Sequence, residues 1–183
     1  MSHGAKVAVF GSARLPETDP RYEAARRVGR LLTEAGLTVC SGGYDGLMAA
    51  VSRGAREAGG HTIGVTLALF DPRPANPWIV EEIKMPTYLS RMERLIELAD
   101  GYLVLPGGTG TLTEMGATWS LRQIRAIPPR PCVLLGESWA RLWQALQREL
   151  TVSAEELAVW QCAATPEEAA DILIRALMGR ERP

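Results

Sequence analysis

The stretch LVLPGGTGTLTE, residues 103–114, places a carboxylate close behind a glycine-rich turn. Glycine lets the backbone approach a ligand closely, and successive free N–H groups at the start of a helix bind anions. The residues of this turn, namely Gly107, Gly108, Thr109, Gly110 and Thr111, have the properties that would suit a bound phosphate. Glu114 then has two interpretations. It either offsets the positive end of a helix as a first-turn acid, or it acts on the part of a ligand that the phosphate anchors.

Two other turns of small residues also follow hydrophobic runs. One contains Gly11 and Ser12, and the other contains Gly42, Gly43 and Gly46. The carboxyl ends of parallel strands meet at one edge of a sheet, so three such turns would converge there. A single turn of this kind is commonly only a tight connection between a strand and a helix. Three converging turns favour a phosphate or nucleotide site.

Arg91 differs in position from the other charged residues of its predicted helix. On a helical wheel of residues 88–100 the apolar side chains share one face, and Arg91 falls beside Leu98 at the shoulder of that face. An arginine in such a place either extends its charged end to solvent or reaches a site at a neighbouring strand end. Arg14, just after the first glycine turn, is a second arginine that could contact phosphate.

Several other classes of site are excluded by composition and spacing. The GGTGT segment lacks the Gly-Lys-Ser/Thr ending of a Walker loop, and Thr113 stands where a Gly-x-Gly-x-x-Gly fingerprint needs its third glycine. The three cysteines are too widely spaced for a zinc site, so no metal is expected. The net charge of −1 gives no general attraction for nucleic acid or anionic membranes. The odd number of cysteines, the short apolar runs and the lack of a signal-peptide pattern at residues 1–4 predict a cytoplasmic protein.

Short hydrophobic runs alternate with segments of helical periodicity along the chain. Strands are expected at residues 6–11, 37–41, 61–66, 101–105, 131–135 and 159–162. Helices are expected at residues 20–36, 45–59, 88–100, 111–125, 138–150 and 166–178. Asp45 is expected to cap the second helix, and the proline-rich residues 67–87 are expected to form an irregular, functional excursion. The alternation predicts an α/β fold, a single doubly wound domain whose parallel sheet is covered by helices on both faces.

The third turn and its carboxylate match a known motif. Residues 106–114, PGGTGTLTE, resemble the PGGxGTxxE motif of the Lonely Guy (LOG) family, often labelled lysine decarboxylase-like. The resemblance extends through the segments VFGS, GGYDGLM and GGHTIGV, and Arg91 stands nine residues before Asp100, as the family's arginine does before its aspartate. It covers about residues 7–125. It implies a Rossmann-like, three-layer α/β/α fold and a homodimer or larger homo-oligomer.

The resemblance also implies an activity. Characterised LOG-family members are phosphoribohydrolases, which cleave the N-glycosidic bond of cytokinin riboside 5′-monophosphate, and often of AMP, to free base and ribose 5-phosphate. By this resemblance Arg91 and Glu114 take the catalytic positions. The nucleotide-binding positions fall on Gly11, Ser12, Gly42, Gly43, Gly46, Met48 and the turn at residues 107–111. A carboxylate can stabilise an oxocarbenium-like cation and activate water, so no metal or organic cofactor is needed.

Differences from the family pattern concern the choice of substrate more than phosphate binding. Thr109 replaces a tyrosine common in the plant-like motif, Thr113 replaces a glutamate, and Met92 replaces a lysine. A related branch with the same core carries molybdenum cofactor without catalysis, so a nucleotide or molybdenum cofactor carrier is the main alternative. An oligomeric scaffold with a vestigial site is a third. Decarboxylation through pyridoxal phosphate is not expected, because neither Lys6 nor Lys84 lies in a glycine turn.

Overall fold

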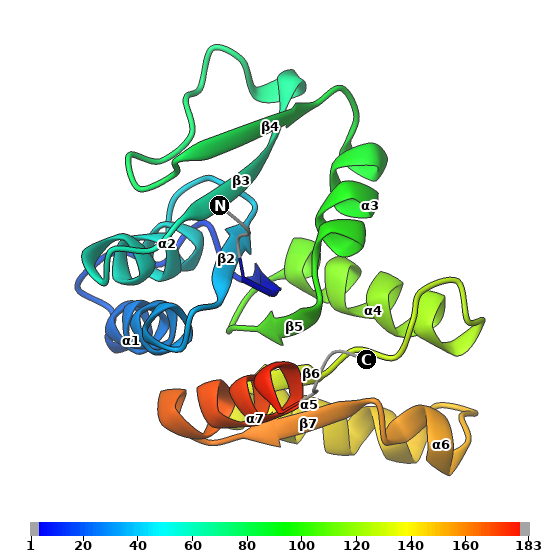
Figure 1. The fold of residues 1–183 in the computed structure, drawn as a ribbon. Coiled ribbons are helices and arrows are strands. Elements are labelled where there is room, and N and C mark those ends of the chain that lie inside the picture. The colour runs from blue at the N-terminus through cyan, green and yellow to red at the C-terminus, as the bar shows by residue number, and fades with distance from the viewer. Residues whose placement is uncertain (1–3, 180–183) are drawn as a thin grey trace.

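The computed structural model describes residues 4–179 as a seven-stranded parallel sheet with helices on both faces (Figure 1). The strands are β1 (Lys6–Phe10), β2 (Thr38–Ser41), β3 (Thr62–Leu67), β4 (Glu81–Met85), β5 (Gly101–Val104), β6 (Cys132–Leu135) and β7 (Trp160–Ala163). The helices are α1 (Pro20–Glu34), α2 (Leu47–Glu57), α3 (Tyr88–Leu98), α4 (Thr109–Gln123), α5 (Glu137–Glu149), α6 (Ala154–Leu157) and α7 (Pro166–Met178), with a 3-10 turn, η1, at Ala68–Phe70. The predicted three-layer α/β fold is confirmed. No helix within residues 4–179 is long and apolar enough to cross a membrane.

The strand order places a change of direction at the centre of the sheet. The order is β4-β3-β2-β1-β5-β6-β7, so the chain builds outward from β1 to β4 and then returns to add β5 on the other side of β1. In open α/β sheets such a reversal leaves a crevice where ligands bind. The loops that flank it are the Gly11–Ser12 turn and the Pro106–Thr111 turn, and Ser12 N–H donates a hydrogen bond to the Pro106 carbonyl at 3.1 Å.

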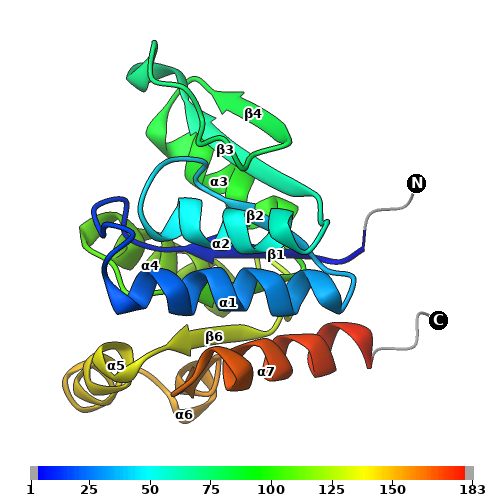
Figure 2. The same cartoon turned by 90° about the vertical axis from the view of Figure 1, so that its left-hand side faces the viewer.

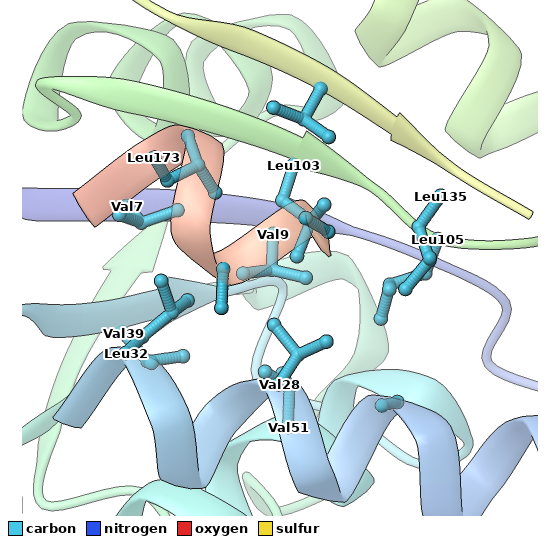
Figure 3. Close-up of a cluster of buried hydrophobic side chains, with 14 of the residues drawn as sticks. Val7, Val9, Val28, Leu32, Val39, Val51, Leu103, Leu105, Leu135 and Leu173 are labelled. Atoms are coloured by element: carbon cyan, nitrogen blue, oxygen red, sulfur yellow. The ribbon is translucent and has the colours of Figure 1, made fainter. Parts of the chain in front are cut away.

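Two apolar cores lie on opposite faces of the sheet, because successive side chains of a strand alternate between its faces. Val7 and Val9 of β1 pack with residues of α1, α2 and α7, which lie together on one side of the sheet (Figures 2 and 3). Ala8 and Phe10 pack with residues of α3, α4 and α5 on the other side. Both faces of the central strands are therefore covered, which fixes the strand ends that carry the glycine turns.

The start of α3 is fixed by polar side chains. Thr87 and Ser90 form a capping box, in which the Thr87 hydroxyl accepts a hydrogen bond from Ser90 N–H at 3.1 Å and the Ser90 hydroxyl accepts one from Thr87 N–H at 3.2 Å. This arrangement satisfies N–H groups that have no partner within the helix. It defines the position of the helix that carries Arg91.

The second helix begins two residues later than the sequence pattern predicts. Gly46, with φ of 64°, occupies the residue before α2, and no side chain caps the helix. The expectation that Asp45 caps it is wrong, because the glycine turn takes the capping position. Asp45 lies outside the helix and pairs instead with Arg73 at 2.5 Å.

The excursion at residues 67–87 is more ordered than expected, because it contains η1 and β4. The β4 strand pairs with β3 at the edge of the sheet, and its sequence EEIKM is largely exposed. Charged residues suit an edge strand, where they discourage pairing with another sheet, but they also hide the alternating hydrophobic pattern. The four-residue helix α6 was missed for a related reason, since one turn is too short to show a period.

Candidate active site

A cavity of about 510 Å³ opens at the carboxyl edge of the sheet, beside the central strands. The structure brings residues of all three predicted turns to this cavity and adds residues from the excursion and from α3. The cavity is lined by Gly11, Ser12, Ala13, Arg14, Tyr44, Met48, Phe70, Arg73, Tyr88, Arg91, Gly108, Thr109, Gly110, Thr111 and Glu114.

The amino end of α4 forms one end of the cavity. Gly108 precedes the helix without a side-chain cap, so the first N–H groups of the helix face the cavity without partners in the helix. A Cβ atom at Gly108 or at Gly110 would meet no atom within 4 Å. The fold itself therefore does not need glycine there, whereas a ligand lying against the backbone would. This end of the cavity has the properties of a phosphate site.

The Arg91 side chain turns inward from α3 and is 9% exposed. Its Nε donates to the Val65 carbonyl at 2.7 Å and its Nη2 donates to the Gly42 carbonyl at 2.9 Å. A Cβ atom at residue 42 would collide with this guanidinium and with Met48 Sδ, so Gly42 makes room for the arginine. The interpretation that Arg91 extends to solvent is wrong, because these carbonyls hold its charged end inside the protein.

Glu114 faces Arg91 across the floor of the cavity. Its Oε1 lies 3.7 Å from Arg91 Nη1, and its side chain is 12% exposed. Since α4 begins at Thr109, Glu114 lies in the second turn of the helix, and the interpretation as a first-turn acid is wrong. Burial raises the pKa of Glu114 from 4.5 to about 7, because desolvation disfavours the carboxylate more than the Arg91 charge stabilises it. Glu114 therefore exchanges its proton near neutral pH, as an acid or base catalyst requires.

Comparison with known proteins identifies the family. The model of the family described as "Possible lysine decarboxylase" matches residues 48–173, which include α3, the PGGTGTLTE segment and both members of the Arg91–Glu114 pair. The chain belongs to this family, the LOG family. The resemblance that the sequence motifs indicate is confirmed.

Two curated relatives of this LOG-family chain are named for nucleotide cleavage. The pyrimidine/purine nucleotide 5′-monophosphate nucleosidase of Escherichia coli strain K12 is 34% identical over 119 residues, which cover 60% of this chain and 25% of that protein. The cytokinin riboside 5′-monophosphate phosphoribohydrolase of Mycobacterium tuberculosis is 34% identical over 116 residues, which cover 62% of each chain. The chain thus matches between a quarter and somewhat under two thirds of the length of these relatives.

A solved structure confirms the fold of the LOG-family chain over most of its length. The molybdenum cofactor binding protein of Rippkaea orientalis has a TM-score of 0.75 and covers 94% of this chain and 96% of its own. The two sequences are 19% identical, so this likeness concerns the fold alone.

Four of the glycines predicted to bind the ligand lie outside the lining of the cavity. Gly42 makes room for Arg91, and Gly43 adopts φ of 76° beside the Thr66 side chain. At Gly46 a Cβ atom would collide with the Ser12 carbonyl, and at Gly107 it would collide with the Thr111 side chain. These glycines shape the turns, while the other predicted site residues line the cavity itself. Within residues 4–179, no cluster of three or more His, Cys, Asp or Glu side chains could hold a metal ion.

The sequence prediction missed five residues that line the cavity, namely Ala13, Tyr44, Phe70, Arg73 and Tyr88. Tyr44 lies within the second glycine turn, where ligand binding was predicted for the glycines. Phe70 and Arg73 belong to the excursion, which was expected to be functional because of its length. Its sequence contains no motif or periodicity that indicates which of its residues face a ligand. Tyr88 was assigned to the apolar face of α3, and it is 41% exposed at the mouth of the cavity.

Asn76 ties the excursion to the second glycine turn. Its side-chain amide donates to the Tyr44 carbonyl at 2.9 Å, and its N–H donates to the Gly43 carbonyl at 2.8 Å. We expect Asn76→Ala to lower the free energy of unfolding by about 1–3 kcal/mol, because a buried carbonyl loses its partner. Urea denaturation measures this loss. Gln144→Ala, at an exposed amide of α5, is the matched control and should change stability little, and equal stabilities of the two variants would contradict the role of Asn76.

Proposed function

We propose that the protein hydrolyses the N-glycosidic bond of a nucleoside 5′-monophosphate, releasing the free base and ribose 5-phosphate. The observation that carries the proposal is the buried Arg91–Glu114 pair, which lies one turn beyond the open amino end of α4 in the same cavity. The names of the two relatives support the class of reaction. By family resemblance the substrates to test first are AMP and cytokinin riboside 5′-monophosphate.

The arrangement suits this chemistry step by step. The phosphate binds the N–H groups at the start of α4, which brings the ribose over Glu114. The bond from C1′ to the base nitrogen breaks, its electron pair goes to the base, and the sugar develops an oxocarbenium-like cation. The Glu114 carboxylate stabilises this cation and takes a proton from the water whose oxygen bonds to C1′. The departing base takes a proton from solvent water, and Glu114 then returns its proton to solvent. Arg91, held by two carbonyls, keeps Nη1 directed toward Glu114 and offers donors to the phosphate or the ribose hydroxyls.

The pKa of Glu114 predicts how the activity depends on pH. We expect kcat/KM to fall as pH drops below about 7, since the protonated side chain neither stabilises a cation nor accepts a proton. Initial rates of base release between pH 5.5 and 8.5 measure this. The substrate phosphate titrates in the same range, so nucleotide binding to Glu114→Gln over these pH values serves as the control. A kcat/KM that stays level from pH 5.5 to 8.5 would contradict the role of Glu114.

The main alternative is a carrier of a nucleotide or of molybdenum cofactor. The exposed arginines Arg14 and Arg73 at the cavity would suit an anionic cargo with a flat ring system, and they support this alternative. Incubation with AMP and with cytokinin riboside 5′-monophosphate, followed by detection of free base, separates the two functions. Absence of base from both nucleotides, together with molybdenum that co-purifies with the protein, would contradict hydrolysis.

The family description names lysine decarboxylation, which we do not propose. That reaction uses pyridoxal phosphate bound to a lysine, and the chain has two lysines. Lys84 pairs with Asp71 at 2.6 Å and Lys6 begins β1 at the opposite edge of the sheet, so neither lines the cavity.

We propose further that the protein is cytoplasmic and forms a homodimer or larger homo-oligomer. Two of its free cysteines, Cys40 and Cys132, are buried without a disulfide, which supports a reducing compartment. Exposed apolar residues on α3 and α4, Leu89 at 68% and Leu112 at 45%, support contact with another copy.

A further inference from the structure

The cavity has a second end, and the contacts among its residues give the order in which they lie. Next to the start of α4 comes Glu114, in the second turn of the helix, and its Oε1 lies 3.7 Å from Arg91 Nη1. The Arg91 guanidinium lies 5.8 Å from the centre of the Tyr44 ring, and the Arg73 guanidinium lies 4.9 Å from the centre of the same ring. A nucleotide whose phosphate binds at the start of α4 and whose ribose lies over Glu114 therefore has its base at Tyr44 and Arg73.

The Tyr44 ring is fixed and almost buried at this end of the cavity, with 4% of the residue exposed. Its hydroxyl donates to the Leu67 carbonyl at 3.2 Å and accepts from Leu67 N–H at 2.8 Å. Phe70 packs against the ring edge-on, with centroids 5.4 Å apart. Both residues line the cavity, and Phe70, which is 44% exposed, offers the flat aromatic surface on which a nucleic acid base stacks.

Arg73 supplies the polar group at this end. Its side chain is 45% exposed and its partner, Asp45, is 68% exposed. An ion pair as exposed as this one contributes little to stability, so the guanidinium can exchange Asp45 for a ligand at little cost. Arginine presents only donors, in a rigid fork that matches two acceptors side by side.

We propose that Arg73 selects nucleotides whose base is a 6-oxopurine, guanine or hypoxanthine, by donating to O6 and N7. This inference rests on the proposed function for the direction in which the nucleotide lies. Guanine carries two acceptors, O6 and N7, on one edge, which is the pattern that an arginine fork reads. Hypoxanthine carries the same pair. Adenine replaces O6 with an amino donor, which would face the donors of Arg73, and pyrimidines lack N7 altogether.

The test compares kcat/KM for the 5′-monophosphates of guanosine, inosine, adenosine, cytidine and uridine with wild-type protein and Arg73 variants. We expect GMP and IMP to exceed the other three by roughly tenfold, the usual worth of one bidentate pair. Arg73→Ala should remove this preference by lowering kcat/KM for GMP and IMP while leaving AMP within about threefold. Arg73→Lys keeps the charge without the fork and should behave like the alanine variant in the ratio of GMP to AMP.

Two further variants separate base recognition from phosphate binding. Arg73→Gln offers one donor and one acceptor, which match adenine, so it should shift the preference toward AMP. Arg14→Ala, in the loop beside the phosphate end, is the matched arginine control and should weaken all five nucleotides alike. A wild-type protein that prefers AMP, or an Arg73→Ala change that is equal for all bases, would overturn the inference while the hydrolase function stands.

Failure of the hydrolase function is recognised separately. If no nucleotide releases base, titration calorimetry of GMP, IMP and AMP with wild-type protein and Arg73→Ala decides the inference alone. Tighter binding of GMP and IMP that depends on Arg73 would sustain base recognition in a protein that is not a hydrolase. Equal binding of GMP, IMP and AMP, or no binding, would overturn it.

Discussion

Replacement of Glu114 by glutamine should lower kcat for base release by about three orders of magnitude, within the range that a positioned acid or base contributes. Glutamine keeps the size and polarity of the side chain but neither stabilises a cation by charge nor accepts the proton of water. Single-turnover rates with the preferred nucleotide measure the loss. Nucleotide affinity should remain within a few-fold, because the phosphate is held at α4. A variant that releases base at the wild-type rate would contradict the assignment of Glu114.

The same substitution should stabilise the protein at alkaline pH. The pKa of Glu114 is raised in the folded state, so the stability that its proton contributes is complete below pH 4.5 and is lost as pH rises through about 7. Glutamine has no charge to desolvate, so Glu114→Gln should gain up to about 3 kcal/mol over wild type at pH 8 and little at pH 4. Urea denaturation at both pH values measures the difference. Glu149→Gln, at an exposed position of α5, is the matched control and should show no such dependence.

The second large effect is expected at Arg91. Arg91→Ala leaves the carbonyls of Val65 and Gly42 without their donor, and we expect it to lower the free energy of unfolding by about 3 kcal/mol. It also removes the positive charge that lowers the pKa of Glu114, so the pH at which activity falls should move upward. The accompanying loss in kcat/KM should be about a hundredfold or more, because the substrate loses the donors of Arg91 and Glu114 is protonated over more of the neutral range.

Two other variants show whether the effect belongs to the guanidinium. Arg91→Lys keeps a charge, but one ammonium group cannot reach both carbonyls and Glu114, so it should recover only a small part of the activity. Arg94→Ala, on the exposed face of the same helix, breaks only a surface pair with Glu97 and should change neither activity nor stability appreciably. If Arg91→Ala kept the wild-type pH profile, the coupling between Arg91 and Glu114 would be disproved.

The fold was accessible from sequence because it depends on patterns that repeat. Buried strands of β-branched and aliphatic residues alternate with amphipathic helices, and a parallel sheet covered on both faces is the arrangement that buries both. The missed strand, β4, lacks this pattern because its position at the sheet edge does not require apolar residues. The misplaced start of α2 has a local cause, since only the conformation at Gly46 shows that Asp45 is outside the helix.

The site could be predicted from the sequence only in part. A helical wheel or a motif indicates which way a side chain points, but not which atoms of other segments lie within contact distance of it. Arg91 could be placed at the shoulder of an apolar face, but not against the carbonyls that hold it, since these belong to segments 49 and 26 residues away. The raised pKa of Glu114 depends on how much surrounding protein excludes water, which no local pattern contains. The base end depends on Phe70 and Arg73, whose segment has no periodicity.

The buried Asn76, which is hydrogen-bonded to the second glycine turn, also bears on the chemical degradation of the protein. Asparagine side chains degrade when the amide carbon is attacked by the backbone nitrogen of the next residue, which forms a cyclic imide. The next residue here is Pro77, whose nitrogen carries no hydrogen, and Asn76 is the one asparagine of the whole chain. The usual route of asparagine deamidation, through the backbone nitrogen of the next residue, is therefore closed in this chain. The loop that shapes the base end therefore gains no new charge by asparagine deamidation.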